Sequence, residues 1–253
     1  DVTAETGVTF RHTDGSSGRY YIMETVCTGL ATFDYDGDGL IDIYFPNGAA
    51  LPGITYDEPP RHALYQNLGD WRFQDVSAQA GIDCTAFGLG ITVGDYDNDG
   101  FPDVYLDNFG PNILYRNNGD GTFSDVTGLA GVPGTTKSGD LEKKVGAGAC
   151  FLDTTGSGCL DLFAGNYVEI ELDTYVTPMK GEYPFYPTPL VYAPIPSTLY
   201  RNSGDGTFTD ASAASGVAAC AGRCMGVTAC DFDHDRDTDL FIGNDVMENF
   251  LLR

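Results

Sequence analysis

The sequence of 253 residues is poor in basic residues, with 13 lysines and arginines against 37 aspartates and glutamates. The resulting formal charge of -24 repels phosphate, which excludes non-specific nucleic-acid binding and disfavours anionic membranes. Histidine is scarce as well, since only His12, His62 and His234 occur. Neither an H-E-x-x-H nor a G-x-S-x-G motif is present. The composition therefore offers little for hydrolytic catalysis.

Long apolar runs are also missing. No stretch approaches the roughly 18 apolar residues of a membrane helix, no signal peptide is present, and no N-x-[ST] glycosylation sequon occurs. The chain starts at Asp1 rather than Met, so we expect a processed or trimmed product. With 42% hydrophobic residues, the chain can still build the core of one large domain, here taken as residues 1–253.

Seven cysteines in an acidic, lysine-poor chain favour an oxidising compartment, and their odd number leaves at least one thiol without an intrachain partner. Disulfides between Cys150 and Cys159 and between Cys220 and Cys224 are candidates, although the sequence does not fix the connectivity. A zinc site of Cys220, Cys224, Cys230 and His234 is disfavoured because His234 lies inside an aspartate-rich loop. The remaining cysteines are Cys27 and Cys84.

Internal repeats dominate the sequence. The loop D-Y-D-G-D-G-L-I-D at residue 34 recurs at residues 95, 153 and 231, and an L-Y-x-N element with a G-D-G-T-F-like turn follows the first three loops. Short aromatic or β-branched runs between Gly, Asn and Asp indicate strands joined by hairpins. Evenly spaced strands with repeated turns predict an all-β fold, a β-propeller of about four blades, rather than a solenoid. The expected units are 26–82, 86–132, 145–217 and 224–253, with an N-terminal strand in 1–10.

Two segments interrupt the repeats. Residues 135–144 contain three lysines and are expected to form a surface excursion. Residues 169–197 are rich in proline and tyrosine, and proline cannot continue a central strand. This insertion is expected to be either a cover packed on the propeller or a partner-binding patch.

The aspartate loops predict metal sites. Carboxylates at positions 1, 3, 5 and 9, with a backbone carbonyl at position 7, give an oxygen-only ligand set that suits Ca²⁺. The alternative is that the aspartates merely cap turns. The high number of aspartates in each loop disfavours this alternative. The position that an EF-hand gives to Glu holds Phe45 and Leu106, so that motif is excluded. The predicted ligands are Asp34, Asp36, Asp38, Leu40 and Asp42; Asp95, Asp97, Asp99, Phe101 and Asp103; Asp153, Thr155, Ser157 and Asp161; and Asp231, Asp233, Asp235, Asp237 and Asp239.

The four loops differ in quality. The first two retain every feature, so Ca²⁺ is expected there. The third has only Asp153 and Asp161 as carboxylates and predicts a weak site. In the fourth, Arg236 replaces the glycine of the turn, which costs about 1 kcal/mol, and a calcium site is still expected.

The D-x-D-x-D-G-x-x-D hairpins and the L-Y-R-N-N-G-D-G-T-F elements resemble FG-GAP/VCBS repeats, the calcium-bearing blades also seen in integrin α-subunits. The stretch from Met225 to Arg253 and the insertion are similar to the cartilage-acidic-protein-like, ASPIC/UnbV-associated group. The resemblance implies a secreted or cell-surface protein and a seven-bladed propeller with a further C-terminal domain. With three units and part of a fourth, this chain resembles the N-terminal half of such proteins.

These observations predict an extracellular, calcium-stabilised scaffold for adhesion, matrix or assembly, with a protein or glycan partner and no enzymatic activity. A carbohydrate-binding module or a polysaccharide-active enzyme is the first alternative. The second is a head-to-tail filament in which residues 1–10 donate an outer strand to a neighbouring molecule. That strand could otherwise complete the chain's own fourth unit or the last blade of a longer chain.

Overall fold

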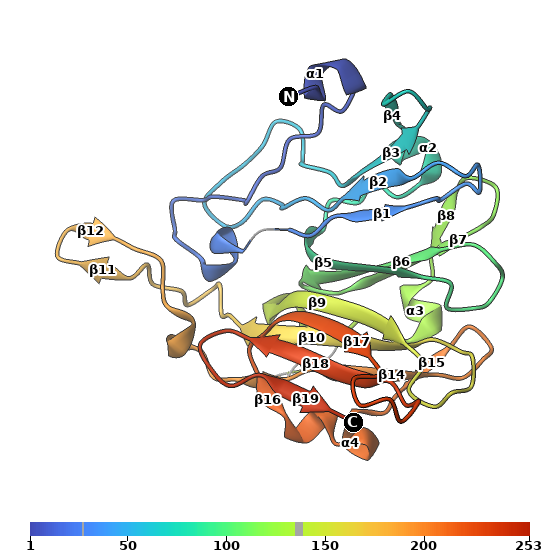
Figure 1. The fold of residues 1–253 in the computed structure, drawn as a ribbon. Coiled ribbons are helices and arrows are strands. Elements are labelled where there is room, and N and C mark those ends of the chain that lie inside the picture. Colours follow the sequence, from blue (N-terminus) through green and yellow to red (C-terminus); the bar gives the residue numbers. More distant parts are fainter. Residues whose placement is uncertain (27, 135–138) are drawn as a thin grey trace.

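The computed structural model describes residues 1–26, 28–134 and 139–253. Antiparallel sheets make up most of the regular structure, and the helices are short turns. The sheets follow one another through the molecule in sequence order, from β1–β4 at the top of Figure 1 to β17–β19 at the bottom. The predicted fold class is confirmed: the chain is all-β and folds as successive propeller blades.

Three repeat units each form a four-stranded blade. The first consists of β1 (Ala31–Phe33), β2 (Asp42–Phe45), β3 (Ala63–Asn67) and β4 (Phe73–Asp75). The second consists of β5 (Phe87–Gly94), β6 (Asp103–Phe109), β7 (Ile113–Asn117) and β8 (Phe123–Asp125). The third consists of β9 (Lys144–Leu152), β10 (Asp161–Glu169), β14 (Thr198–Asn202) and β15 (Phe208–Asp210).

The last unit contributes three strands, β17 (Cys224–Cys230), β18 (Asp239–Asn244) and β19 (Phe250–Leu252). In each blade an aspartate loop joins the first strand to the second. The register of the first blade pairs Phe33 with Asp42, so the loop between them is a closed hairpin. The second and third blades also share one bridge, between Phe109 and Val145.

A helical turn follows the outer strand of each complete blade. These turns are α2 (Ser77–Ala80), α3 (Thr127–Ala130) and α4 (Ser212–Ser215), and each ends at a glycine with positive φ. In the first blade the Ser77 hydroxyl accepts the Leu64 N–H at 2.8 Å, and the Ser77 N–H donates to Asp75. The repeated D-V-T/S sequence therefore encodes a turn that is anchored to the neighbouring strand.

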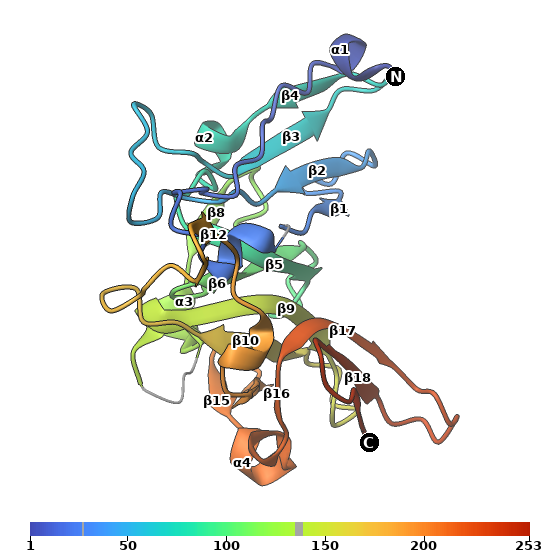
Figure 2. The same ribbon diagram turned by 90° about the vertical axis from the view of Figure 1, so that its left-hand side faces the viewer.

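Residues 1–10 correct one expectation. They contain the helical turn α1 (Thr3–Thr6) and no strand. This turn lies against the first blade, where a Cβ on Gly7 would come within 2.6 Å of the carbonyl oxygen of Phe73. The N-terminus lies at the opposite end of the molecule from the C-terminus, which directly follows β19, in both views (Figures 1 and 2). The segment therefore does not complete the chain's own fourth unit.

The hydrophobic core lies between successive blades. Tyr44 and Leu64 of the first blade pack with Val104 and Leu106 of the second. Two similar clusters fill the spaces between the second and third blades and between the third and fourth. Each blade thus buries its faces by packing on its neighbours, as in other repeat architectures. A further cluster packs the segment before the first blade, including Tyr21 and Met23, against Phe87 and Val168.

The first strands of successive blades lie next to one another, in the order β1, β5, β9 and β17. Glycines allow this close approach. A Cβ on Gly90 would lie 2.9 Å from the backbone nitrogen of Gly148, and one on Gly148 would lie 3.3 Å from the Cα of Gly226. Only glycine lets these backbones pack so closely.

The insertion 169–197 forms an arm that extends from the third blade (Figure 1). It contains β11 (Met179–Lys180), β12 (Tyr183–Pro184), the 3-10 turn η3 (Pro189–Val191) and β13 (Ile195–Pro196), which pairs with β16 (Ala221–Gly222). Its base is tied to the segment before the first blade, because the Tyr175 hydroxyl donates to the Tyr20 carbonyl at 2.6 Å. The remaining 3-10 turns are η1 (Ile22–Thr25), η2 (Leu141–Lys143) and η4 (Val217–Ala219).

The other insertion is only partly a surface excursion. Residues 135–138 lie outside the described residues. Lys144, which was expected on the surface, opens β9 and is 0% exposed. None of the described helices has the length and apolar character needed to cross a membrane.

The two predicted disulfides do not form in the structure. The cysteines that it describes as free thiols are Cys84, Cys150, Cys159, Cys220, Cys224 and Cys230, while Cys27 lies outside the described residues. The register of β9 and β10 places Cys150 opposite Phe163, so Cys159 does not face it. Cys224 is buried in β17, with its Sγ near the Gly226 carbonyl.

Candidate metal centre

The first aspartate of each loop organises the loop backbone. In the first loop the Asp34 carboxylate accepts the N–H groups of Gly37 at 2.8 Å, Asp38 at 3.1 Å and Gly39 at 2.9 Å. Gly39 has a φ of +86°, which favours glycine at this turn. Asp95, Asp153 and Asp231 accept backbone N–H groups in the same way. The repeated sequence therefore encodes one loop conformation.

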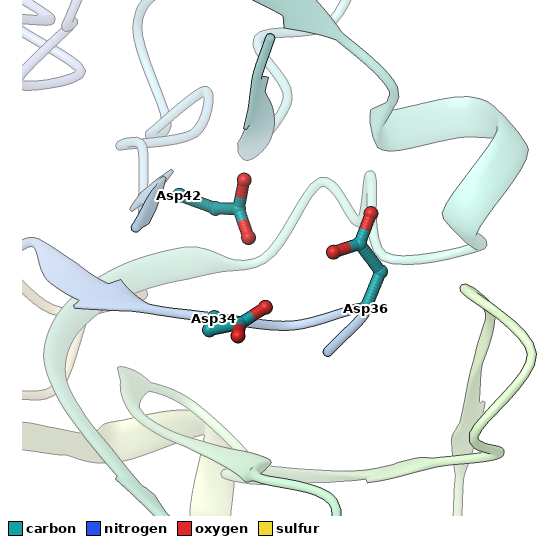
Figure 3. Close-up of side chains that lie close together, drawn as sticks. All are labelled: Asp34, Asp36 and Asp42. Atoms are coloured by element: carbon teal, nitrogen blue, oxygen red, sulfur yellow. The ribbon is translucent and has the colours of Figure 1, made fainter. Parts of the chain in front are cut away.

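Three of the four loops gather a trio of carboxylates. In each trio the ligand oxygens lie within 4.8 Å of one another. Figure 3 shows the first trio, in which Asp34, Asp36 and Asp42 surround a common space. The trios are Asp34, Asp36 and Asp42; Asp95, Asp97 and Asp99; and Asp231, Asp233 and Asp239. Oxygen-only sets of this kind fit a hard divalent cation.

The ninth aspartate of each loop is buried at the start of the second strand. Asp42 and Asp103 are both 0% exposed. Asp42 accepts the backbone N–H groups of Tyr35 at 3.0 Å and Asn67 at 2.7 Å. Burial raises the pKa of Asp42 to about 6 and that of Asp103 to about 7, although these backbone hydrogen bonds act in the opposite direction. The ionised form is thus costly here unless a cation offsets the charge.

Several predicted ligands lie outside the trios. These are Asp38, Asp103, Asp235 and Asp237. Asp38 accepts the N–H of Leu40 at 2.8 Å, and Asp99 accepts that of Phe101 at 3.0 Å. The aspartate at position 5 therefore shapes the turn whether or not it also binds metal. The carbonyl groups of Leu40 and Phe101 remain predicted ligands.

The third loop has no trio among the residues that the structure describes. Its two carboxylates are engaged by the protein itself. Asp153 accepts the N–H groups of Thr155, Ser157 and Gly158, and Asp161 accepts the Thr154 hydroxyl and the Asn202 N–H. The third loop thus keeps the hydrogen bonds that its counterparts Asp34 and Asp42 make in the first loop, but it does not gather three carboxylates.

A cationic side chain from outside the fourth loop, Arg253 after β19, contacts its aspartates. The Arg253 guanidinium lies 2.6 Å from Asp233 and 3.0 Å from Asp235. Arg236, which replaces the turn glycine, has a φ of 78°, so the expected backbone strain is present. In the first blade the place of Arg253 is taken by Gln66, whose side-chain amide donates to Asp36 at 2.6 Å.

Three asparagines of the L-Y-x-N elements support the loops. The Asn117 N–H donates to Asp103 at 2.8 Å, and its side-chain amide donates to the Tyr35 carbonyl of the preceding blade, also at 2.8 Å. Asn202 links Asp161 and the Tyr96 carbonyl in the same way. Asn67 donates to Asp42. Sequence reasoning missed this role, although the repetition of L-Y-x-N was its signal.

Replacement of Asn117 by Ala is expected to lower the free energy of unfolding by about 1–3 kcal/mol, because the buried carbonyl of Tyr35 would lose its hydrogen-bond donor. Urea denaturation at fixed calcium measures this change. The neighbouring Asn118→Ala variant is the control, since Asn118 is exposed. Equal losses in the two variants would show that Asn117 does not connect the blades.

The fold and the loops define a class of protein, a β-propeller of FG-GAP-like repeats. The family model described as "FG-GAP-like repeat" matches residues 49–106 and 190–242. The predicted family resemblance is confirmed by this match together with similarity to curated proteins over 91% of the chain.

Those curated proteins are called cartilage acidic protein 1. The chain is 27% identical to the Homo sapiens protein over 241 residues, which is 91% of this chain and 32% of the relative. It is 31% identical to the Xenopus tropicalis protein over 244 residues, or 91% of this chain and 33% of the relative. The chain thus spans about a third of the length of these relatives.

A solved structure of an Agrocybe aegerita lectin, described as recognising non-reducing terminal N-acetylglucosamine, also resembles the chain. The identity is 17% and the TM-score 0.41, with 86% of this chain and 48% of the lectin chain covered. This likeness is too low to transfer a ligand.

Proposed function

We propose that the chain is a calcium-stabilised propeller segment that serves as a structural or adhesive scaffold outside the cell. The carboxylate trios are the observation that supports calcium. Asp34, Asp36 and Asp42 would hold one ion, and the trios of the second and fourth blades would hold two more. A bound Ca²⁺ would supply the positive charge that offsets the repulsion within each trio.

An extracellular location is supported by the relatives and by the type of metal site. The relatives are named cartilage acidic proteins, and this chain has the same acidic character. Exposed aspartate loops of modest ligand number suit the calcium concentrations found outside cells. A scaffold role is preferred over catalysis because the candidate metal ligands are aspartates that also fix the backbone of their loops.

The arm of residues 169–197 is the proposed contact surface for a protein or glycan partner. Val176 is 82% exposed, Tyr183 78% and Leu190 65%, and the β11–β12 hairpin extends away from the blades (Figure 1). Exposed aromatic side chains are common in protein interfaces and also stack on sugars. Glycan-array binding would support the carbohydrate-binding alternative, and turnover of a polysaccharide would contradict the non-enzymatic role.

Single changes within a trio test the calcium sites. Asp36→Ala and Asp97→Ala are each expected to weaken binding at one site on the order of tenfold or more, because each removes a carboxylate of a trio. Ser157→Ala, in the third loop, should have a much smaller effect. Isothermal titration calorimetry with Ca²⁺ measures the affinity and the number of sites.

The matched control is Asp57→Asn, which removes one negative charge at an exposed position outside the loops. It separates the loss of a ligand from the loss of general negative charge. If Asp57→Asn weakens binding as much as Asp36→Ala, the loops are not the calcium sites.

A further inference from the structure

Three polar side chains meet inside the junction of the second and third blades. Asp107 comes from β6, Asn112 from the turn before β7, and Lys144 from the start of β9. Their exposed fractions are 0%, 1% and 0%. The Lys144 Nζ lies 2.6 Å from Asp107 Oδ1 and 2.8 Å from Asn112 Oδ1. A buried amine is thus held against a side-chain amide and a carboxylate.

The propeller fold does not require this trio. The same place in the repeat as Asp107 is occupied by Pro46, Gly165 and Gly243 in the other blades, and that of Lys144 by Thr25, Ala86 and Gly222. The place of Asn112 holds His62 in the first blade, Ser197 in the third and Asn249 in the fourth. The asparagine therefore recurs once, but no other blade has an aspartate at the place of Asp107 or a lysine at that of Lys144, so the meeting of all three at one junction calls for a separate explanation.

Glycines make room for the group. A Cβ on Gly146 would lie 2.1 Å from Asp107 Oδ1 and 2.7 Å from Lys144 Nζ. A Cβ on Gly134 would lie 3.1 Å from Asn112 Nδ2. Any other residue at these positions would displace the amine or the amide.

We propose that Lys144 and Asn112 form an intramolecular amide cross-link, with Asp107 accepting the first proton that the amine loses. The Lys144 ammonium gives one proton to Asp107, and the neutral Nζ attacks Asn112 Cγ to form the new C–N bond. A second proton passes from Nζ to the amide nitrogen of Asn112. The bond between Cγ and that nitrogen then breaks, and ammonia leaves. No oxidant or further reactant is needed.

The surroundings match each step. The Asn108 backbone N–H donates to Asn112 Oδ1 at 3.0 Å, so a donor faces the oxygen on which negative charge develops. The departing nitrogen, Asn112 Nδ2, lies 2.7 Å from the Tyr105 hydroxyl. Burial raises the pKa of Asp107, which favours its acceptance of a proton from Lys144. Exclusion of water keeps the attacking amine from being solvated.

Mass spectrometry of the intact, reduced chain tests the proposal directly. The measured mass is expected to be lower than the sequence mass by one ammonia. After digestion, one branched peptide should join the segments around Asn112 and Lys144, and trypsin should not cleave after Lys144. A mass equal to that of the sequence would overturn the proposal and leave an ordinary buried ion pair.

Ammonia is also lost when an Asn-Gly pair forms a succinimide, so the site of loss must be mapped. Asn47–Gly48 and Asn118–Gly119 are the pairs in this chain. A loss located at either pair, without a branched peptide, overturns the proposal. The succinimide also hydrolyses at mildly alkaline pH, whereas the cross-link persists.

Variants separate the roles of the three residues. Asp107→Asn should retain the full sequence mass, because the proton carrier is gone. Asn112→Asp can form the same amide with loss of water, so its cross-linked product should have the same mass as cross-linked wild type. Lys143→Met is the control, since Lys143 pairs with Asp140 and Glu171 and should not affect the mass loss. Loss of ammonia that persists in Lys144→Met would contradict the assignment, even if other variants fail to fold.

Discussion

Excess EGTA is expected to lower the midpoint of thermal unfolding, Tm, by on the order of 10 °C relative to millimolar Ca²⁺. Each trio brings carboxylates within 4.8 Å of one another, and their repulsion opposes folding when no cation is present. Ligand that binds only the folded state adds several kcal/mol at saturation. For a domain of this size, each kcal/mol shifts Tm by roughly 2–4 °C.

Differential scanning calorimetry or circular dichroism measures the shift, and its dependence on calcium concentration gives the apparent affinity. Mg²⁺ is the ionic control, because it demands a tighter octahedral shell and should restore less of the stability than Ca²⁺. Equal midpoints in EGTA and in Ca²⁺ would contradict both the calcium sites and their structural role.

The conformation of the aspartate loops was predictable because residues close together in the sequence determine it. Aspartates at fixed spacing, with Gly39 and Gly100 in the turns, determine a hairpin whose first carboxylate accepts the backbone N–H groups. The same spacing predicted that the third loop is different, and among the described residues that loop gathers no carboxylate trio. Repetition of the pattern also predicted the blades, since each copy needs neighbours to bury its faces.

Long-range partners could not be predicted in the same way. Asp38 and Asp99 occupy the same position of their loops, yet only Asp99 belongs to a trio. Asn117 reaches the Tyr35 carbonyl of another blade, a contact that depends on how the blades pack. Lys144 reads as a surface lysine in a lysine-rich segment, and only the fold places it beside Asp107.

The second large expected effect is the dependence of stability on pH through His62, which does not involve metal. It is 1% exposed, its Nε2 lies 3.0 Å from the Ala86 carbonyl, and its Nδ1 lies 3.0 Å from the Tyr44 hydroxyl. Since a carbonyl only accepts, Nε2 carries the proton of the neutral ring. Burial lowers the pKa of His62 from 6.5 to about 4.

The pH dependence follows from the proton balance. As the pH falls below 6.5, the unfolded chain protonates His62, whereas the folded chain does not until about pH 4. The unfolded state therefore binds more protons in this window, so the stability that neutral His62 provides is present above pH 6.5 and is lost toward pH 4. The loss amounts to about 3 kcal/mol, because each unit of pKa shift corresponds to about 1.4 kcal/mol.

His62→Asn is expected to remove this acid-induced loss while keeping the fold, because Asn112 occupies the same place in the second blade and donates to Tyr105 at 2.7 Å. The measurement is the difference in unfolding free energy between wild type and variant at several pH values, by urea denaturation. Comparison at each pH cancels the contribution of the carboxylates to the unfolding free energy, because it is the same in both proteins. Their raised pKa values change the stability with pH in the opposite direction to His62. His12→Asn, at an exposed histidine, should leave the wild-type profile unchanged. A difference between wild type and His62→Asn that stays constant from pH 6.5 to about 4 would show that His62 is not held neutral by burial.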